Sequence, residues 1–434
     1  MPHHTVWSIP HSAADGGLHA LHSYNAGCDI HKVALRQSAP SDEQQSSPAG
    51  RFASRARLYL PPNKMTMQIA PPGLKGLAVS DTDLGAVRGE EGFFHYRQYN
   101  AVDLARTRTL EEVWALQING ALPPEAPVID PGPMRAIPEE AAQVVDAASS
   151  RMDDPMSVLR VGLLAVAAIE GRGPLLDRSA DERRGDALRL AAVVPTVLAR
   201  HQRRRAGLDP LGPDPSLSHA ADYLRMNTGT EPSQDAARAV EQYLITTLDH
   251  GFNVSTFASR VVASTGADMA SALVAGLGAL SGPLHGGAPS RVMDMIDEIG
   301  TPARAAEWVR SRLDSGQKIM GFGHAVYRVN DPRGVVLRSA AEDLGGDLVE
   351  RAAGIEEEIL AVLADWKPNQ RILTNVEYWA SVVLELAGLP REMFTPTFAV
   401  SRSIGWSAHV LEQAQNGKLL RPSARYTGPE PARS

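Results

Sequence analysis

Apolar residues recur at helical spacing along most of this chain, and this pattern constrains its fold more than any other feature. From Asp103 onward, period-2 alternation is scarce, and helical segments follow one another with Gly or Pro between them. Thr109 begins one segment and Glu112 lies three positions later, which is the pattern of a capping box. Further helices are expected at 138–149, 156–170, 181–205, 234–248 and 253–280. The sequence therefore predicts an all-α fold, with one minor hairpin near 93–98.

Length and composition permit a large helical protein and exclude several classes of partner. The 434 residues are enough for more than one domain, and a hydrophobic content of 43% supplies a buried core. A formal charge of -7 argues against a nucleic-acid surface. The longest apolar-looking run, 269–280, is far shorter than the roughly 20 residues that a membrane span requires. We therefore expect neither nucleic acid nor a membrane as a partner.

The first 67 residues differ in composition from the rest of the chain. They mix Pro, Ser, Gln and acidic residues and contain no apolar core of the signal-peptide type, so a disordered extension is expected over 1–67. The single cysteine, Cys28, excludes a disulfide framework within the chain. Because one cysteine fits a reducing compartment, we expect a cytoplasmic protein.

The segment 253–280 is poor in charge and rich in Ala, Gly, Ser and Val. Small residues allow helices to approach closely, so this segment is expected to be buried on all sides. We also expect it to lie at an interface between subunits.

Three histidines lie in glycine-rich or capped junctions between helical segments: His250, His285 and His324. Glycine lets backbone and ligand approach closely, and imidazole exchanges a proton near neutral pH, so these junctions are typical of an active site. Their wide spacing matches no short metal-ligand motif, so no metal is expected. A solitary histidine between helices is more often structural. That interpretation is kept for His95, His201, His219 and His409.

Three shorter motifs follow toward the C-terminus, namely Asn375-Val376-Glu377-Tyr378, Val400-Ser401-Arg402 and Leu420-Arg421-Pro422. Together with the histidine segments, and in the same order, they resemble the citrate synthase family over residues 72–429. The resemblance implies an all-α, two-domain fold that works as a homodimer. The large helical domain is expected over 68–285 and 391–434, and the smaller helical domain is expected as an insert over 286–390.

The resemblance also implies an activity. Citrate synthases are acyltransferases that join the methyl carbon of acetyl-CoA to the ketone of oxaloacetate and then hydrolyse the thioester to citrate and CoA. A methyl group beside a thioester is a very weak acid, so a base and an oxyanion donor must act together. By position in the matching motifs, Glu377 is the base, His285 the donor to the thioester oxygen and His324 the group that polarises the ketone. Because acetyl-CoA is a substrate, no cofactor is implied.

Binding residues are carried over from the same motifs. His250 and three arginines resemble the oxaloacetate-binding residues, and guanidinium groups match the geometry of carboxylates. The arginines are Arg333, Arg402 and Arg421, and in the family the last of these reaches the partner subunit's site. Arg328 falls where the family contacts a CoA phosphate. The segment that resembles the family's adenine-wrapping loop is Ile319, Met320, Gly321, Phe322 and Gly323.

The sequence departs from the family at two positions. Most of the family has aspartate where this chain has Glu377, and one more methylene moves the carboxylate. The surrounding Asn-Val-x-Tyr frame is intact, and a bacterial branch carries glutamate there, so we interpret Glu377 as a working base. Ser423 stands where many bacterial members have arginine. Two alternatives stay open: 2-methylcitrate synthase, which uses propionyl-CoA through the same residues, and a catalytically silent protein that binds CoA and oxaloacetate.

Overall fold

The computed structural model describes residues 68–283, 285, 289–324 and 326–432. The chain divides into two units, and the second, Ile69–Ser434, contains the helices and strands given below. The extension expected to be disordered, 1–67, lies outside the described residues. The division of the helical part into a large and a small domain stays a prediction.

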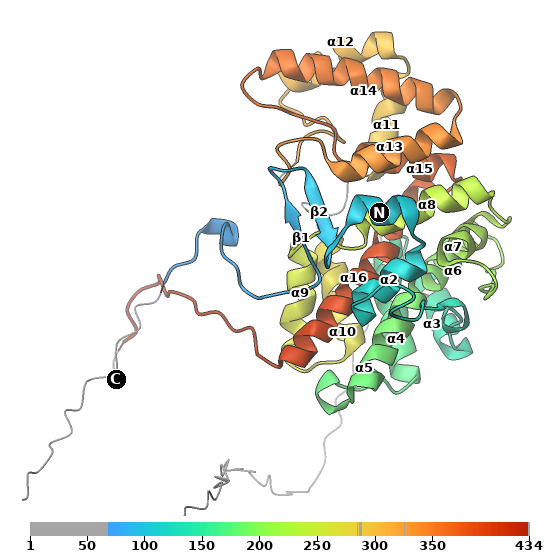
Figure 1. The fold of residues 1–434 in the computed structure, drawn as a ribbon, viewed down its shortest axis with the longest axis vertical. Helices are drawn as coiled ribbons and strands as arrows, with labels where there is room; N and C mark the ends of the chain where they lie inside the picture. The colour runs from blue at the N-terminus through green and yellow to red at the C-terminus, as the bar shows by residue number, and fades with distance from the viewer. Residues whose placement is uncertain (1–67, 284, 286–288, 325, 433–434) are drawn as a thin grey trace, which may run out of the picture. The chain divides into compact units, whose positions relative to one another are not determined.

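The described residues are mostly helical, which confirms the predicted fold class (Figure 1). The helices of the first half are α1 (Ala101–Thr107), α2 (Leu110–Asn119), α3 (Glu139–Ser149), α4 (Pro155–Ile169), α5 (Ala180–Ala192), α6 (Val194–Arg205), α7 (His219–Thr228) and α8 (Gln234–Thr247). The helices of the second half are α9 (Val254–Ala263), α10 (Met269–Leu280), α11 (Pro289–Ile299), α12 (Pro302–Asp314), α13 (Pro332–Leu344), α14 (Asp347–Trp366), α15 (Val376–Leu386) and α16 (Phe394–Asn416). Short 3-10 helices lie at Pro72–Leu74, Gly132–Met134, Leu175–Asp177 and Arg391–Met393.

Side-chain caps begin many of these helices, and the sequence predicts one of them, at Thr109. The Thr109 hydroxyl accepts from the Glu112 N–H, and the Glu112 carboxylate accepts from the Thr109 N–H, so the predicted capping box of α2 is confirmed. Helix α5 begins with a second capping box, between Ser179 and Glu182. Each box satisfies N–H groups that the first turn of a helix leaves without a partner.

Two predicted helices are each divided in the structure, so the predicted boundaries were wrong. The segment 181–205 breaks at Val193 into α5 and α6, because Pro195 in the first turn of α6 has no N–H for a continuous helix. The segment 253–280 breaks between α9 and α10, where Gly266 has a left-handed φ of +80°. The expected burial on all sides was also wrong for the single chain, because Val254 is 64% exposed.

The described strands form one small antiparallel sheet in the order β1 (Gly85–Arg88), β2 (Phe93–Tyr96) and β3 (Tyr99–Asn100). Phe94 of β2 is paired with Val87, and Tyr96 is paired with both Gly85 and Tyr99. The predicted strand near 93–98 is confirmed, but its main partner is β1, which precedes it in the sequence. The turn between β1 and β2 contacts the loop after His324, since the Arg328 N–H donates to the Gly89 carbonyl.

Helix α16 is the packing centre of the described chain. It contacts α5, α8, α9 and α10 (Figure 1). Its buried Trp406 is among the largest side chains of the core. Helices α13 and α15 pack on each other and on α8, so the ends of these three helices lie close together. The junctions before α13 and α15 and after α8 carry most of the predicted site residues.

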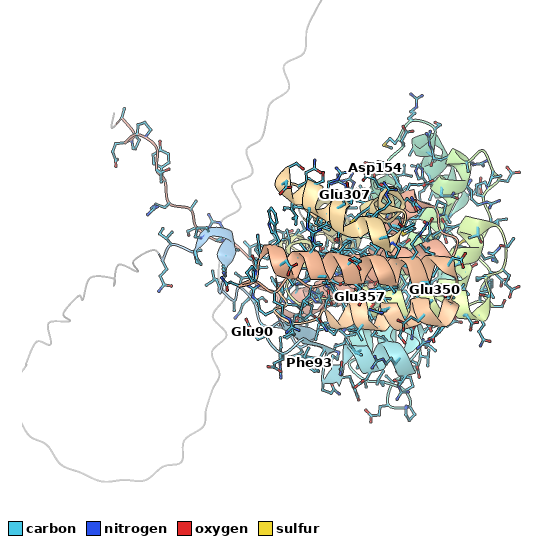
Figure 2. All side chains as sticks on the ribbon, turned by 90° about the horizontal axis from the view of Figure 1, so that it is seen from above. Glu90, Phe93, Asp154, Glu307, Glu350 and Glu357 are labelled. Atoms are coloured by element: carbon cyan, nitrogen blue, oxygen red, sulfur yellow. The ribbon has the colours of Figure 1, made fainter. Side chains whose placement is uncertain are left out.

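Helices α12 and α14 pack on each other at one end of the molecule (Figure 1). Their solvent faces carry acidic side chains, including Glu307, Glu350 and Glu357 (Figure 2). Glu356, next to Glu357, is instead buried and accepts hydrogen bonds from Arg338 and from the indole of Trp379. This pair of helices is therefore amphipathic, and Glu356 ties α14 to α13 and α15.

Candidate active site

His324 lies in the loop before α13, and backbone groups set its tautomer. Its Nδ1 accepts from the N–H groups of Val326 and Tyr327, both at 2.9 Å. A neutral imidazole that accepts at Nδ1 carries its proton on Nε2. Burial, together with the charge of Arg333, lowers the pKa of His324 to about 4, so the ring is neutral at physiological pH. His324 is therefore a hydrogen-bond donor at Nε2.

The Arg333 guanidinium, in the first turn of α13, faces this donor. Its Nη2 lies 3.2 Å from His324 Nε2, and because both nitrogens then carry N–H groups, neither satisfies the other. Burial alone would lower the pKa of Arg333, but the neighbouring Asp331 carboxylate raises it above its ordinary value, so the guanidinium stays charged. An oxygen atom that met both groups would receive one hydrogen bond from a neutral ring and one from a cation.

Asp331 holds this arrangement together, and the sequence analysis missed it. Its carboxylate caps α13 through the Arg333 N–H and forms a bidentate pair with the Arg333 guanidinium, at 3.0 Å to Nε and 2.8 Å to Nη2. The same carboxylate accepts from the Val376 N–H at 3.1 Å, at the start of α15. The Asp-Pro pair at 331–332 is a helix-start signal that could have identified the cap. It could not have revealed the contact with α15.

Glu377 lies in the first turn of α15, where Asn375 is the cap. The Asn375 side chain accepts from the Glu377 N–H at 2.9 Å and donates to the Gly323 carbonyl at 3.0 Å. Burial raises the pKa of Glu377 to about 7, while Arg333 opposes this rise and Asp331 adds to it. The carboxyl group is thus poised to exchange a proton near neutral pH.

His250 lies between the end of α8 and the start of α9, against the same group of side chains. Its Nε2 is 2.9 Å from the Tyr327 hydroxyl, and its ring meets the His324 ring edge-on at a centroid distance of 5.9 Å. Burial lowers the pKa of His250 well below its ordinary value, and the charges of Arg333 and Arg402 add to this effect. His250 is therefore a second neutral imidazole. Tyr327, which links the two rings, is another residue that the sequence analysis missed.

Arg402 supplies a second buried cation from the middle of α16. It is 2% exposed, its Nε donates to the Thr247 carbonyl at 3.0 Å, and it lies over the Phe398 ring. Burial lowers its pKa, and the charge of Arg333 lowers it further, whereas Asp249 raises it. The part of the chain that the structure describes contains no ion pair between Arg402 and a carboxylate. Arg402 and Arg333 together favour an anionic ligand.

His285 borders a cavity that Glu377 also borders. Both line a small cavity of about 40 Å³ with Tyr243, Thr247, Val376, Ala380 and Phe398. The Nε2 of His285 is 2.9 Å from the Ser255 hydroxyl, so Ser255 is a third residue that the sequence analysis missed. Burial lowers the pKa of His285, and a hydrogen bond to its own backbone opposes this effect. A proton acceptor and an imidazole thus border one apolar space.

The segment predicted to bind CoA, 319–323, lines a larger pocket that also reaches the Glu377 carboxyl group. This pocket, of about 540 Å³, is lined by all five residues of 319–323 and by Glu377. Gly321 is needed here, because its φ is +80° and a side chain would meet the Tyr378 ring. Arg328 is exposed and lines a neighbouring pocket of about 500 Å³, together with His324 and Arg371.

Arg421 is a predicted site residue that does not lie with the other site residues of the same chain. It is exposed in the segment after α16, as is Ser423. The preceding residue, Leu420, donates its N–H to the Ser264 hydroxyl at the end of α9.

His409 is buried between Asp249 and Arg260, which agrees with the structural role expected for it from the sequence.

Two features of other protein classes are absent from the described residues. Within the described residues, no group of three or more His, Cys, Asp or Glu side chains could hold a metal ion. Among the helices of that same part of the chain, none combines the length and apolar character needed to cross a membrane.

Replacing Asp331 tests whether its carboxylate holds the site together. Asp331→Asn leaves the buried Arg333 without its counter-charge, so the free energy of unfolding should fall by about 3–5 kcal/mol in urea denaturation. Glu91→Gln is the control, because the Arg88–Glu91 pair is more than half exposed and should contribute about 0–1 kcal/mol. Equal losses in the two variants would contradict the assignment.

Comparisons with known proteins agree with this site. The family model "Citrate synthase, C-terminal domain" matches residues 73–423. A citrate synthase of Haloferax volcanii is 37% identical over 82% of this chain and 95% of its own length. A 2-methylcitrate synthase of Mycobacterium tuberculosis is 38% identical over 82% of this chain and 90% of its own length.

A solved structure extends the similarity to three dimensions. The citrate synthase of Thermoplasma acidophilum, in a ternary complex with carboxymethyl coenzyme A and oxaloacetate, matches with a TM-score of 0.76 and 28% identity. The match covers 85% of this chain and 98% of that chain. The chain therefore belongs to the citrate synthase family, and it is an acyltransferase of the citrate synthase type.

Proposed function

We propose that this chain condenses acetyl-CoA with oxaloacetate and hydrolyses the citryl thioester to citrate and CoA. The observation that carries the proposal is the position of Glu377 between two groups of residues. His285 borders it across the small cavity, and the Asp331–Arg333 pair is joined to the start of its helix. A base that lies between an acyl site and a ketone site is what a carbon–carbon condensation requires.

The proposed first step is removal of a proton from the acetyl methyl group. Glu377 takes this proton, and the electron pair of the C–H bond moves into the enolate while His285 stabilises the charge on the thioester oxygen. A carboxylate whose pKa is about 7 is a stronger base than an ordinary glutamate, so burial favours this step. Asn375 fixes the Glu377 backbone at the start of α15, from which the side chain reaches the cavity.

The proposed second step joins the enolate carbon to the ketone of oxaloacetate. His324 donates from Nε2 to the ketone oxygen, because two backbone N–H groups hold its Nδ1 as an acceptor. Arg333 and Arg402 bind the carboxylates, and His250 adds a neutral donor beside them. The citrate synthase of Thermoplasma acidophilum, which binds oxaloacetate and a CoA derivative, supports this choice of ligands.

We place the CoA moiety along the pocket lined by residues 319–323. This pocket runs from exposed Gln317 and Lys318 to Glu377, so a ligand in it could bring its acyl end to the base. Arg328 is exposed nearby and is available to a phosphate group.

Release of a thiol tests the proposed reaction. We expect the purified protein to release CoA when acetyl-CoA and oxaloacetate are mixed, as a thiol reagent reports. Glu377→Gln should lower kcat at least about 100-fold because the base is gone, while calorimetry shows unchanged affinity for oxaloacetate. Binding of both substrates without any release of CoA would instead support the catalytically silent alternative.

The second candidate is 2-methylcitrate synthase, which the relative in Mycobacterium tuberculosis favours. One methylene in an apolar pocket changes binding by only ~1–3 kcal/mol, so both acyl-CoA substrates can react through the same residues. The thiol assay with propionyl-CoA as the acyl donor separates the candidates. A higher kcat/KM for propionyl-CoA than for acetyl-CoA overturns our choice.

The pKa of Glu377 predicts how the activity depends on pH. A base acts only when deprotonated, so kcat/KM should rise tenfold per pH unit below about pH 7 and level off above it. His324, with a pKa of about 4, stays neutral across this range and adds no second transition. Initial rates between pH 5 and pH 8.5 check this expectation, and a flat profile would contradict the role of Glu377.

We also propose that the protein works as a cytoplasmic homodimer in which Arg421 enters the partner's site. Its single cysteine fits a reducing compartment. Arg421 is exposed in its own chain, and two exposed leucines lie beside the α9–α10 turn, where a second copy could cover them. These are Leu176, 74% exposed, and Leu419, 57% exposed.

Coexpression of two inactive variants tests the shared site. If Arg421 acts in the partner, a mixed dimer of Arg421→Ala and Glu377→Gln contains one complete site. Random pairing should then restore about a quarter of the unchanged protein's activity, although each variant alone is nearly inactive. No recovery in mixed dimers, isolated through a different affinity tag on each variant, would place Arg421 in its own chain's site or outside both.

A further inference from the structure

The Tyr243 hydroxyl is a buried polar group that the mechanism above does not use. Tyr243 lies on α8, is 1% exposed, and its hydroxyl has no hydrogen-bond partner among the described residues. Buried polar groups in folded proteins almost always have a partner, and one without a partner is destabilising. Such an exception calls for a functional explanation.

The surroundings of Tyr243 indicate what that function is. Its side chain lines the 40 Å³ cavity that His285 and Glu377 also border. The other hydroxyl there, on Thr247, is already engaged, because it donates to the Tyr243 carbonyl and lies 3.0 Å from the Ser401 hydroxyl. The remaining lining residues, Val376, Ala380 and Phe398, have apolar side chains. Tyr243 is thus a free donor in the space assigned to the acyl group.

The chemistry of the phenol favours a donor role over proton transfer. Burial raises the pKa of Tyr243, and the charge of Glu377 adds to this rise, while Arg402 and Arg333 oppose it. The hydroxyl therefore keeps its proton at every physiological pH. It can donate a hydrogen bond to an oxygen that becomes negative during the reaction without releasing the proton.

We propose that Tyr243 is a further catalytic residue, whose hydroxyl donates a hydrogen bond to the thioester oxygen of the acyl-CoA. This inference rests on the proposed function. When Glu377 takes the methyl proton, the C–H electron pair forms the new carbon–carbon double bond, and the carbonyl pair moves onto the thioester oxygen. Tyr243 and His285 then stabilise that oxygen together, and the phenol remains protonated throughout.

Tyr243→Phe tests the proposal, because it removes only the unpaired hydroxyl. We expect kcat/KM for acetyl-CoA to fall about 100-fold, as for the loss of one oxyanion donor. The melting temperature should be equal or higher, since a destabilising group is gone. The midpoint of the pH profile should not move, because the hydroxyl acts on the substrate and not on Glu377.

Tyr223→Phe is the matched control, because Tyr223 is equally buried but its hydroxyl has a partner. It lies 2.9 Å from the Thr397 hydroxyl, and Tyr223 does not line the cavity. This variant should lose stability and keep its activity. The proposal is supported if Tyr243→Phe loses activity but not stability, while Tyr223→Phe loses stability but not activity.

The proposal is contradicted by unchanged activity of Tyr243→Phe, by a loss of stability like that of Tyr223→Phe, or by a displaced pH midpoint. Calorimetry separates this proposal from the proposed function. Tyr243→Phe should bind acetyl-CoA about 5-fold more weakly and CoA equally well, because only the acyl-CoA carries the thioester oxygen. If Tyr243→Phe and the unchanged protein bind acetyl-CoA equally well, the proposal for Tyr243 is wrong. If the unchanged protein releases no thiol, the proposed function is wrong.

Discussion

The carboxylate of Asp331 is the interaction on which the rest of the site depends. It accepts hydrogen bonds from the backbone and guanidinium of Arg333, and from the Val376 N–H at the start of α15. Burying one charge is costly, but here the charge is paired and its oxygens are satisfied from two helices. Through this one group, the proposed ketone-binding residues are held in register with the proposed base, Glu377.

Burial then determines the protonation state of the groups around that pair. It raises the pKa of Glu377 and lowers those of His250, His285 and His324. These directions are opposite because desolvation always disfavours the charged form, which is the anion in one case and the cation in the others. The result is a carboxyl group that exchanges a proton near neutral pH beside imidazoles that are neutral. The positive charge near these groups is carried by two arginines, Arg333 and Arg402.

The same principle explains why the site has two sides of different character. Around His324 the polar groups are densely hydrogen-bonded to one another, which suits a small dianion. Around His285 the lining is mostly apolar, and the Tyr243 hydroxyl stands among side chains that do not satisfy it. Glu377 borders both sides. A carboxylate in that place can react with an acyl group on one side and deliver the resulting carbon nucleophile to the other.

Local patterns in the sequence determined the fold class and the approximate bounds of a few helices, such as α3, α4 and α8. Caps such as Thr109 and apolar spacing act over a few residues, so they can be recognised without knowing the fold. The breaks at Val193 and Gly266 were missed because the apolar pattern continues through them, while one proline and one left-handed glycine end the helices. The histidine and arginine motifs could be recognised because the resemblance depends on their order.

Only the tertiary structure decided how these residues act. The bonds from Asp331 to α15, from Tyr327 to His250 and from Ser255 to His285 join segments that are distant in sequence. The shifted pKa of Glu377 likewise depends on desolvation, which is a property of the packed environment and not of the residue. The sequence alone thus specified which chemical groups are present. Packing set their charge, their tautomers and their partners, because these depend on distances that only the folded chain establishes.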